Sequence, residues 1–97
     1  MMNPSRDNLF PLGRVVATPG ALAALDAAGV FPARLLSRHR SGDWGDLEQE
    51  DKNSNDFAVN NGLRVFSAYI LPSTGQKVWL ITEADRSSST FLLPEEY

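Results

Sequence analysis

The chain has 97 residues, 42% of them hydrophobic and 22% charged, which is typical of one folded domain. The absence of cysteine excludes disulfides, thiolate zinc sites and cysteine nucleophiles. A net charge of −3 with only two lysines argues against direct nucleic-acid binding, which depends on cations that face phosphates. No apolar run approaches the ~20 residues that cross a bilayer, and the start lacks a signal-peptide pattern. We therefore expect a cytoplasmic protein without membrane contact.

The first half of the chain predicts one strand and two helices after a flexible, polar N-terminus at residues 1–8. Residues 15–17 predict a short strand. In "TPGALAALDAAG" (18–29), Thr18 fits the N-cap, Pro19 the first turn and Gly29 the position after the end. "VFPARLLSRHRSG" (30–42) repeats this pattern between Pro32 and Gly42.

The second half predicts a third helix and three strands. "DLEQEDKNSNDFAVNNG" (46–62) has Asp46 as N-cap, Gln49 in a capping-box position and Gly62 as the stop. Strands are predicted within 63–71, 77–83 and 90–94, and their short connections favour an antiparallel meander. Residues 9–97 thus predict a single α+β domain of order β-α-α-α-β-β-β, with an antiparallel sheet and helices packed on one face.

The stretch "HRSGDWGDLEQED" (39–51) is the first candidate for function. Six of the twelve acidic residues lie between positions 43 and 56, with Lys52 as the one base. Such a run can dock on a basic surface of a protein partner, for example a nucleic-acid-binding protein, and an exposed tryptophan would anchor the contact. This hypothesis assigns partner binding to Asp43, Trp44, Asp46, Glu48, Glu50 and Asp51. The simpler interpretation is a solvated acidic face with Trp44 folded over the helix junction.

A small enzyme or a ligand- or metal-binding protein is the alternative. Its polar site would combine residues from the helix junction and from the last turn: His39, Asp43, Asp46, Glu83, Asp85 and Arg86. The chain has no G-x-S-x-G elbow and no strong metal-ligand spacing. We therefore assign no catalytic residue, metal ligand or cofactor, and the simpler interpretation of His39 is a structural histidine.

A homo-oligomer is the third possibility. Its contact surface would be the edge of the sheet or the apolar side chains near the C-terminus, Phe91, Leu93 and Tyr97.

Three blocks, "LFPLGRVVATPGALAAL", "HRSGDWGDL" and "ITEADRSSSTFLLPEEY", resemble a small bacterial family encoded on plasmids, integrative elements and prophages. The resemblance spans Leu9 to Tyr97, except for "EQEDKNSNDFAVNNG", and no activity is tied to these blocks. It implies a mobile-element protein that acts by binding, such as an anti-CRISPR or antirestriction inhibitor or a modulator of a DNA-processing complex.

Overall fold

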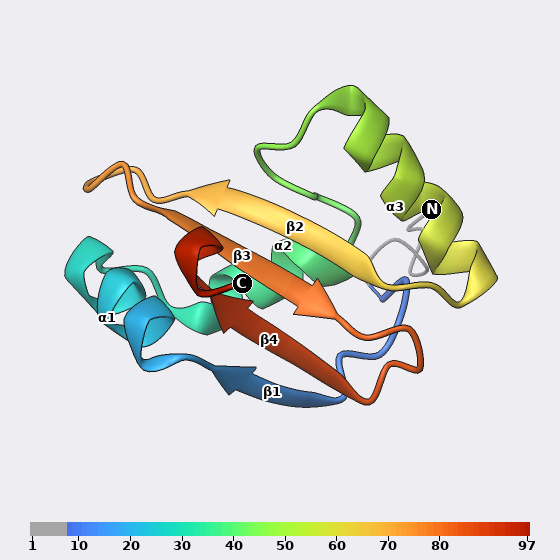
Figure 1. Cartoon of the computed structure of the whole chain (residues 1–97), viewed down its shortest axis with the longest axis horizontal. Helices are drawn as coiled ribbons and strands as arrows, with labels where there is room; N and C mark the ends of the chain where they lie inside the picture. Colours follow the sequence, from blue (N-terminus) through green and yellow to red (C-terminus); the bar gives the residue numbers. More distant parts are fainter. Residues whose placement is uncertain (1–7) are drawn as a thin grey trace, which may run out of the picture.

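The computed structural model describes residues 8–97, so the predicted flexible segment lies outside the described residues except for Asn8. The elements follow one another along the chain in the order β1 (Arg14–Ala17), α1 (Pro19–Ala28), α2 (Pro32–Arg40), α3 (Gln49–Asn61), β2 (Val65–Ile70), β3 (Lys77–Thr82), β4 (Ser88–Leu92) and the 3₁₀ turn η2 (Pro94–Glu96). The predicted α+β class and element order are confirmed (Figure 1).

The sheet has four strands in the order β1-β4-β3-β2. The predicted meander is confirmed, since β2 pairs antiparallel with β3, and β3 with β4. The prediction of a wholly antiparallel sheet is wrong, because β1 lies parallel to β4. A parallel pair needs a long crossover, and here all three helices, β2 and β3 lie between the two strands.

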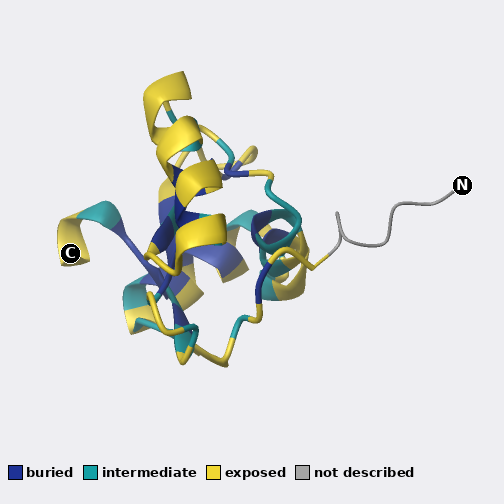
Figure 2. Cartoon of the chain, turned by 90° about the vertical axis from the view of Figure 1, so that its right-hand side faces the viewer, coloured by how far each residue is buried: buried dark blue, intermediate teal, exposed yellow. Residues whose placement is uncertain are grey.

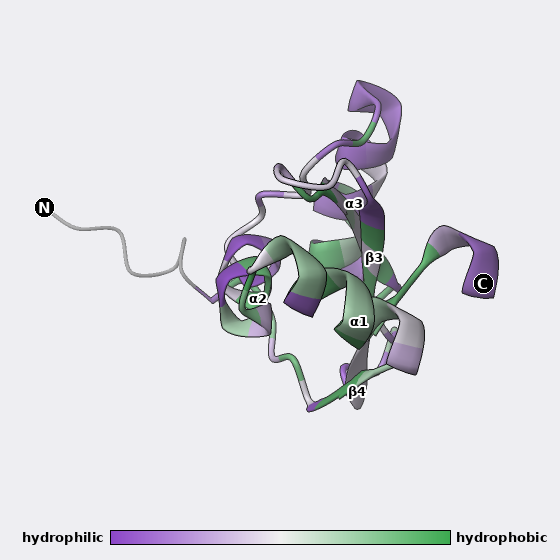
Figure 3. Ribbon diagram, turned by 90° about the vertical axis from the view of Figure 1, so that its left-hand side faces the viewer, coloured by the Kyte–Doolittle hydropathy of each residue, from purple (hydrophilic) through white to green (hydrophobic). Residues whose placement is uncertain are grey.

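The main hydrophobic core lies between the sheet and the first two helices. It joins buried residues of α1 and α2 to inward side chains of the strands and of the residues that follow them: Ala21, Ala24, Leu25, Leu35, Tyr69, Leu71, Val78, Leu80, Phe91 and Leu93. α1 is largely hydrophobic, whereas α3 is largely hydrophilic (Figure 3). The strong polarity of α3 means that it contributes little to this core.

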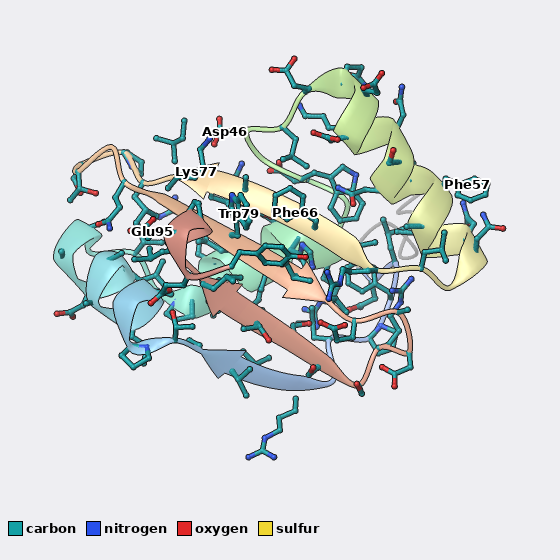
Figure 4. The ribbon with its side chains drawn as sticks, in the orientation of Figure 1. Asp46, Phe57, Phe66, Lys77, Trp79 and Glu95 are labelled. Carbon is teal, nitrogen blue, oxygen red and sulfur yellow. The ribbon has the colours of Figure 1, made fainter. Side chains whose placement is uncertain are left out.

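The opposite face of the sheet carries η2 and a row of aromatic rings. Phe66 of β2 and Trp79 of β3 meet edge to face with ring centroids 4.9 Å apart, and Tyr97 meets Trp79 at 5.6 Å. Phe66 and Trp79 lie side by side at the centre of this face (Figure 4). Edge-to-face contacts of this kind stabilise a partly exposed sheet surface.

The predicted ends of the first two helices are confirmed. The Thr18 side chain accepts a hydrogen bond from the Ala21 N–H, and Gly29 follows α1 in the left-handed conformation at φ 68°. Pro32 opens α2, and Gly42 follows its end at φ 91°. These signals act within one or two turns of chain, which is why the sequence reveals them.

The predicted start of the third helix is wrong, although Gly62 ends it as predicted. α3 begins at Gln49 with Glu48 as N-cap, and no side chain caps it. Asp46 instead bonds to β2, with its carboxylate Oδ2 accepting from the Ile70 N–H at 2.8 Å. The Asp46 side chain, which the local pattern predicted as the cap of α3, thus makes a tertiary contact with β2 instead.

A second, smaller apolar cluster fastens α3 and the N-terminal segment to the sheet. Its buried members come from four different parts of the chain: Phe10, Trp44, Ala58 and Val65. In residues 8–97, no single helix is long and apolar enough to cross a membrane. α1 and α2 meet the requirements for length and apolar composition only when they are taken together, and the pair is bent by 103°.

Candidate functional site

The α2–α3 loop, residues 41–48, lies along the outer edge of β2. The Ala68 N–H donates to the Trp44 carbonyl at 3.2 Å, and the Asp46 N–H donates to the Ala68 carbonyl at 2.6 Å. Gly45 thereby forms a parallel bridge with Ala68. The loop thus closes this edge of the sheet, which is more than a joint between two helices requires.

Only glycine fits at position 45. Its φ of 79° lies in the left-handed region, and an added Cβ would clash with the Ala68 carbonyl oxygen. Both the conformation and the backbone approach therefore require the absence of a side chain.

Arg38 and Asp43 hold the start of the loop. Arg38 Nε lies 2.7 Å from Asp43 Oδ2, and its guanidinium stacks over the Tyr69 ring at 4.6 Å. The hydrogen bond from Arg38 lowers the pKa of Asp43, and the same bond raises the pKa of Arg38. The Tyr69 hydroxyl donates to the Asp43 carbonyl at 2.7 Å, and burial raises the pKa of this phenol. Asp43 thus serves the fold.

Trp44 is buried, with 3% of its surface exposed, so its assignment as an exposed anchor for a partner is wrong. Its indole Nε1–H donates to Asp56 Oδ1 at 3.0 Å, and its ring stacks with Phe10. The physical reason is the bridge at Gly45, which turns the preceding side chain inward under α3. Trp44 covers the helix junction, as in the simpler interpretation.

His39 is completely buried in a chain of hydrogen bonds. Its Nδ1 lies 2.5 Å from Ser67 Oγ and its Nε2 2.9 Å from Thr82 Oγ1. Thr82 Oγ1 lies 2.6 Å from Ser89 Oγ, which donates to the Leu12 carbonyl. Burial, with a smaller effect from the charge of Arg86, lowers the pKa of His39 to about 3. The ring is neutral near pH 7 and links α2 to three strands, so its role here is structural.

The remaining acids of the stretch lie on the surface. Asp46, Glu48, Glu50 and Asp51 are all exposed. Within residues 8–97 the ion pairs are Arg38–Asp43 and Arg64–Glu83, so none of these four carboxylates has a cationic partner there. They form an acidic surface at the N-terminal end of α3, which is exposed along much of its length (Figure 2).

An open groove lies beside α3, between the helix and the residues that follow it. It has a volume of about 570 Å³ and is lined by Glu50, Asn53, Ser54, Phe57, Ala58, Leu63 and Arg64. Phe57 is 61% exposed and Leu63 48% exposed, and Phe57 projects outward from α3 (Figure 4). We call Glu48, Glu50, Asp51, Phe57 and Leu63 the α3 surface.

The structure brings only part of the alternative polar site together, because Arg86 lies near enough to His39 to lower its pKa whereas Asp46 bonds to Ile70 at the end of β2. His39 bonds to Ser67 in β2 and to Thr82 in β3. Ser67 and Ile70 are three positions apart along the strand, which is about 10 Å. His39 is also inaccessible to a substrate in this conformation.

The residues of the last turn are likewise engaged within the fold. The Arg86 guanidinium donates to the carbonyls of Leu63 and Ala58, at 2.5 and 3.1 Å, rather than to an acid. Asp85 Oδ1 accepts from the Ser87 N–H within the turn, and Glu83 lies 3.4 Å from Arg64. Arg86 thereby satisfies carbonyls at the end of α3.

The structure also bears on the metal hypothesis and on the C-terminal residues that were candidates for an oligomer contact. In the part of the chain that the structure describes, no group of three or more His, Asp or Glu residues could hold a metal ion. Phe91 and Leu93 are buried, so their assignment as a sticky surface is wrong, whereas Tyr97 is 72% exposed. Both buried residues point from the sheet toward α1, where the main core needs them.

Sequence reasoning missed Phe57 and Leu63. A signal for Phe57 was present, because it is the one aromatic residue in the largely polar segment "KNSNDFAVNNG" (52–62). Ala58 is the buried residue of that turn, and the neighbouring position on a helix is rotated by ~100°, which places Phe57 on the outside.

Comparison of the chain with protein-family models, curated proteins and solved structures finds no match.

Proposed function

We propose that this chain is a non-enzymatic, cytoplasmic protein-binding module that uses the α3 surface to hold a basic segment of a partner protein. The observation that carries the proposal is the exposure of Phe57, 61%, beside a groove and unpaired carboxylates on the same helix. An aromatic side chain left in water on a polar helix has no role in the core. Aromatic residues with this exposure are the usual anchors of protein interfaces.

Apolar and acidic groups have separate roles in the proposal. Phe57 and Leu63 would be covered by the partner, and burial of an aromatic side chain removes about 150–250 Å² of surface from water. Glu48, Glu50 and Asp51 would attract a basic surface and orient it, which raises the rate of association more than the affinity. Asp43 and Trp44 no longer belong to the binding residues, because the fold uses both.

The resemblance to mobile-element proteins supplies a class of partner for the proposal. Complexes that process or restrict DNA present basic surfaces, and an acidic helix is complementary to them. A modulator of host defence or of DNA processing is therefore the form of the proposal that we would test first.

The test is capture of partners by tagged protein from lysate of a bacterium with defence systems, with and without substitutions. Phe57→Ala, and separately Glu50→Lys with Asp51→Lys, should abolish capture. Asp46 is left unchanged because its carboxylate bonds to β2.

Matched controls lie on the other side of the molecule. Phe31 is 80% exposed and Asp26 is exposed, and both lie at the α1–α2 junction. Phe31→Ala and Asp26→Lys should therefore leave capture unchanged. Loss of capture in these controls, with retention in Phe57→Ala, would refute the proposed surface.

A further inference from the structure

One edge strand of the sheet is covered by a loop and the other is not. The α2–α3 loop covers β2, whereas within residues 8–97 no strand pairs with the outer side of β1. β1 forms the lower margin of the sheet in Figure 1. The Arg14 N–H donates to the Ser87 carbonyl and the Thr18 N–H to the Phe91 carbonyl, at 2.9 and 3.0 Å. Since backbone groups alternate along a strand, those of Val15 and Ala17 point outward.

The side chains along this edge are apolar and exposed. Val15 is 44% exposed and Val16 38% exposed, one on each face of the strand. Natural edges are usually protected by charge, proline, a bulge or a covering loop. β1 has Arg14 at its beginning and none of these devices at Val15 and Val16. The edge is therefore suited to pairing with another strand.

We propose that β1 pairs antiparallel with β1 of a second copy of this chain, so that the two sheets become continuous across a two-fold axis at Val16. Only this register pairs Val15 of each copy with Ala17 of the other, and it uses all the outward N–H and C=O groups of both strands. A shift by two residues in one direction would pair Ala17 with Gly13, which lies outside the strand. A shift in the other direction would pair Val15 with Pro19, which has no N–H.

The charges next to the edge match in the same register. Arg14 would lie opposite Thr18 of the second copy, on the face that carries η2. The Thr18 hydroxyl donates to Glu96 Oε1 at 2.6 Å, so a carboxylate is held at that position. Each Arg14 would thus meet Glu96 of the other copy, and the contact would occur twice by symmetry. A surface that is complementary to itself in this way favours a second copy over an unrelated strand.

The first test is the molar mass of the protein by sedimentation equilibrium between about 10 µM and about 1 mM, a range that covers weak dissociation constants. We expect a dimer at the upper end of this range. Val15→Pro removes an outward N–H without breaking the ladder to β4, and it should leave a monomer. Val15→Thr retains that N–H and should remain dimeric. A wild type that is monomeric throughout, or a dimer that persists in Val15→Pro, would overturn the proposal.

The second test does not depend on how well the proline is tolerated. Arg14→Glu alone brings glutamates together at both contacts, and Glu96→Arg alone brings arginines together, so each variant should dimerise at least tenfold more weakly. In an equimolar mixture, every contact between unlike chains joins a glutamate to an arginine. The mixture should recover the dimer, and its failure to do so would exclude this register.

Discussion

The β2 side and the β1 side of the same sheet show two treatments of a strand edge. On the β2 side, one loop bridges Ala68, bonds Ile70 and buries Trp44 over His39. On the β1 side, Val15 and Val16 remain exposed. The stretch with the densest chemistry in the sequence is therefore largely used in closing the fold, whereas plain strand residues are left available for contact.

This difference changes which residues are candidates for function. A histidine, a tryptophan and an aspartate in one short segment suggest a site, yet each has a partner within the fold. Exposed apolar side chains such as Phe57 on α3 and Val16 on β1 are among those left for contact with other molecules. We call the β2 edge, which the α2–α3 loop covers, the sealed edge, and the β1 edge the open edge. Four predictions test the contrast between them, beginning with the largest effect.

The free energy of unfolding should fall in acid, because His39 is buried next to the sealed edge in its neutral form. Its pKa is about 3 in the folded chain against 6.5 as the ordinary value, so the unfolded chain takes up the proton first. The contribution of His39 is complete above pH 6.5 and declines as the pH falls toward 3, by up to about 5 kcal/mol. Urea unfolding at several pH values measures it.

The matched variant for this prediction is His39→Gln, which retains hydrogen-bonding groups but does not titrate. Its free energy of unfolding should depend less on pH between 6.5 and 4 than that of the wild type. Equal slopes would mean that His39 is not buried in the neutral form.

Gly45→Ala should destabilise the sealed edge by about 3 kcal/mol, because it combines a left-handed φ with a clash against the Ala68 carbonyl. Gly62→Ala is the matched control, since Gly62 has a similar φ of 63° and no neighbour within 4 Å. The control should cost about 1 kcal/mol. Thermal or urea denaturation of both variants separates backbone strain from the clash.

Asp46→Ala should lower the free energy of unfolding by about 1 kcal/mol, because the Ile70 N–H loses its side-chain acceptor. Glu48→Ala is the comparison, since Glu48 precedes α3 without a capping bond from its side chain. It should change stability by less than about 0.5 kcal/mol. Equal effects in the two variants would mean that the bond from Asp46 to Ile70 contributes nothing to stability.

Val16→Thr on the open edge should have the smallest effect, below about 0.5 kcal/mol, because the Val16 side chain is 38% exposed and belongs to neither apolar cluster described above. The measurement is urea unfolding at low micromolar concentration, where the proposed pairing is dissociated. A large loss there would mean that the Val16 side chain is packed against its own chain.

Short-range signals explain what the sequence predicted well. Thr18, Pro19 and Gly29 act within α1 itself, and the short turns after β2 and β3 leave their neighbouring strands little choice but to pair antiparallel. The helix end at Gly62 was found for the same reason, since glycine adopts the left-handed φ of 63° without strain.

The candidate site was predicted less well, because its residues compete for partners that are distant in the sequence. Asp46 fits a helix cap by pattern, but the exposed N–H of Ile70 takes its carboxylate. Trp44 between two glycines looks exposed, but Phe10 and Asp56 surround it. The polar character of the segment does not distinguish side chains that bond within the fold, such as Asp46, from carboxylates that have no ion pair within residues 8–97, such as Glu48 and Glu50.

By itself, the sequence determined the class of the fold, the ends of the first two helices and the three-stranded meander, since these depend on periodicity and on turn residues close in the chain. Only the tertiary structure decided that β1 lies parallel to β4, that the α2–α3 loop covers the β2 edge, and that His39 is buried among hydroxyl groups. Each of these features joins segments more than twenty residues apart, and no local pattern specifies such a pairing.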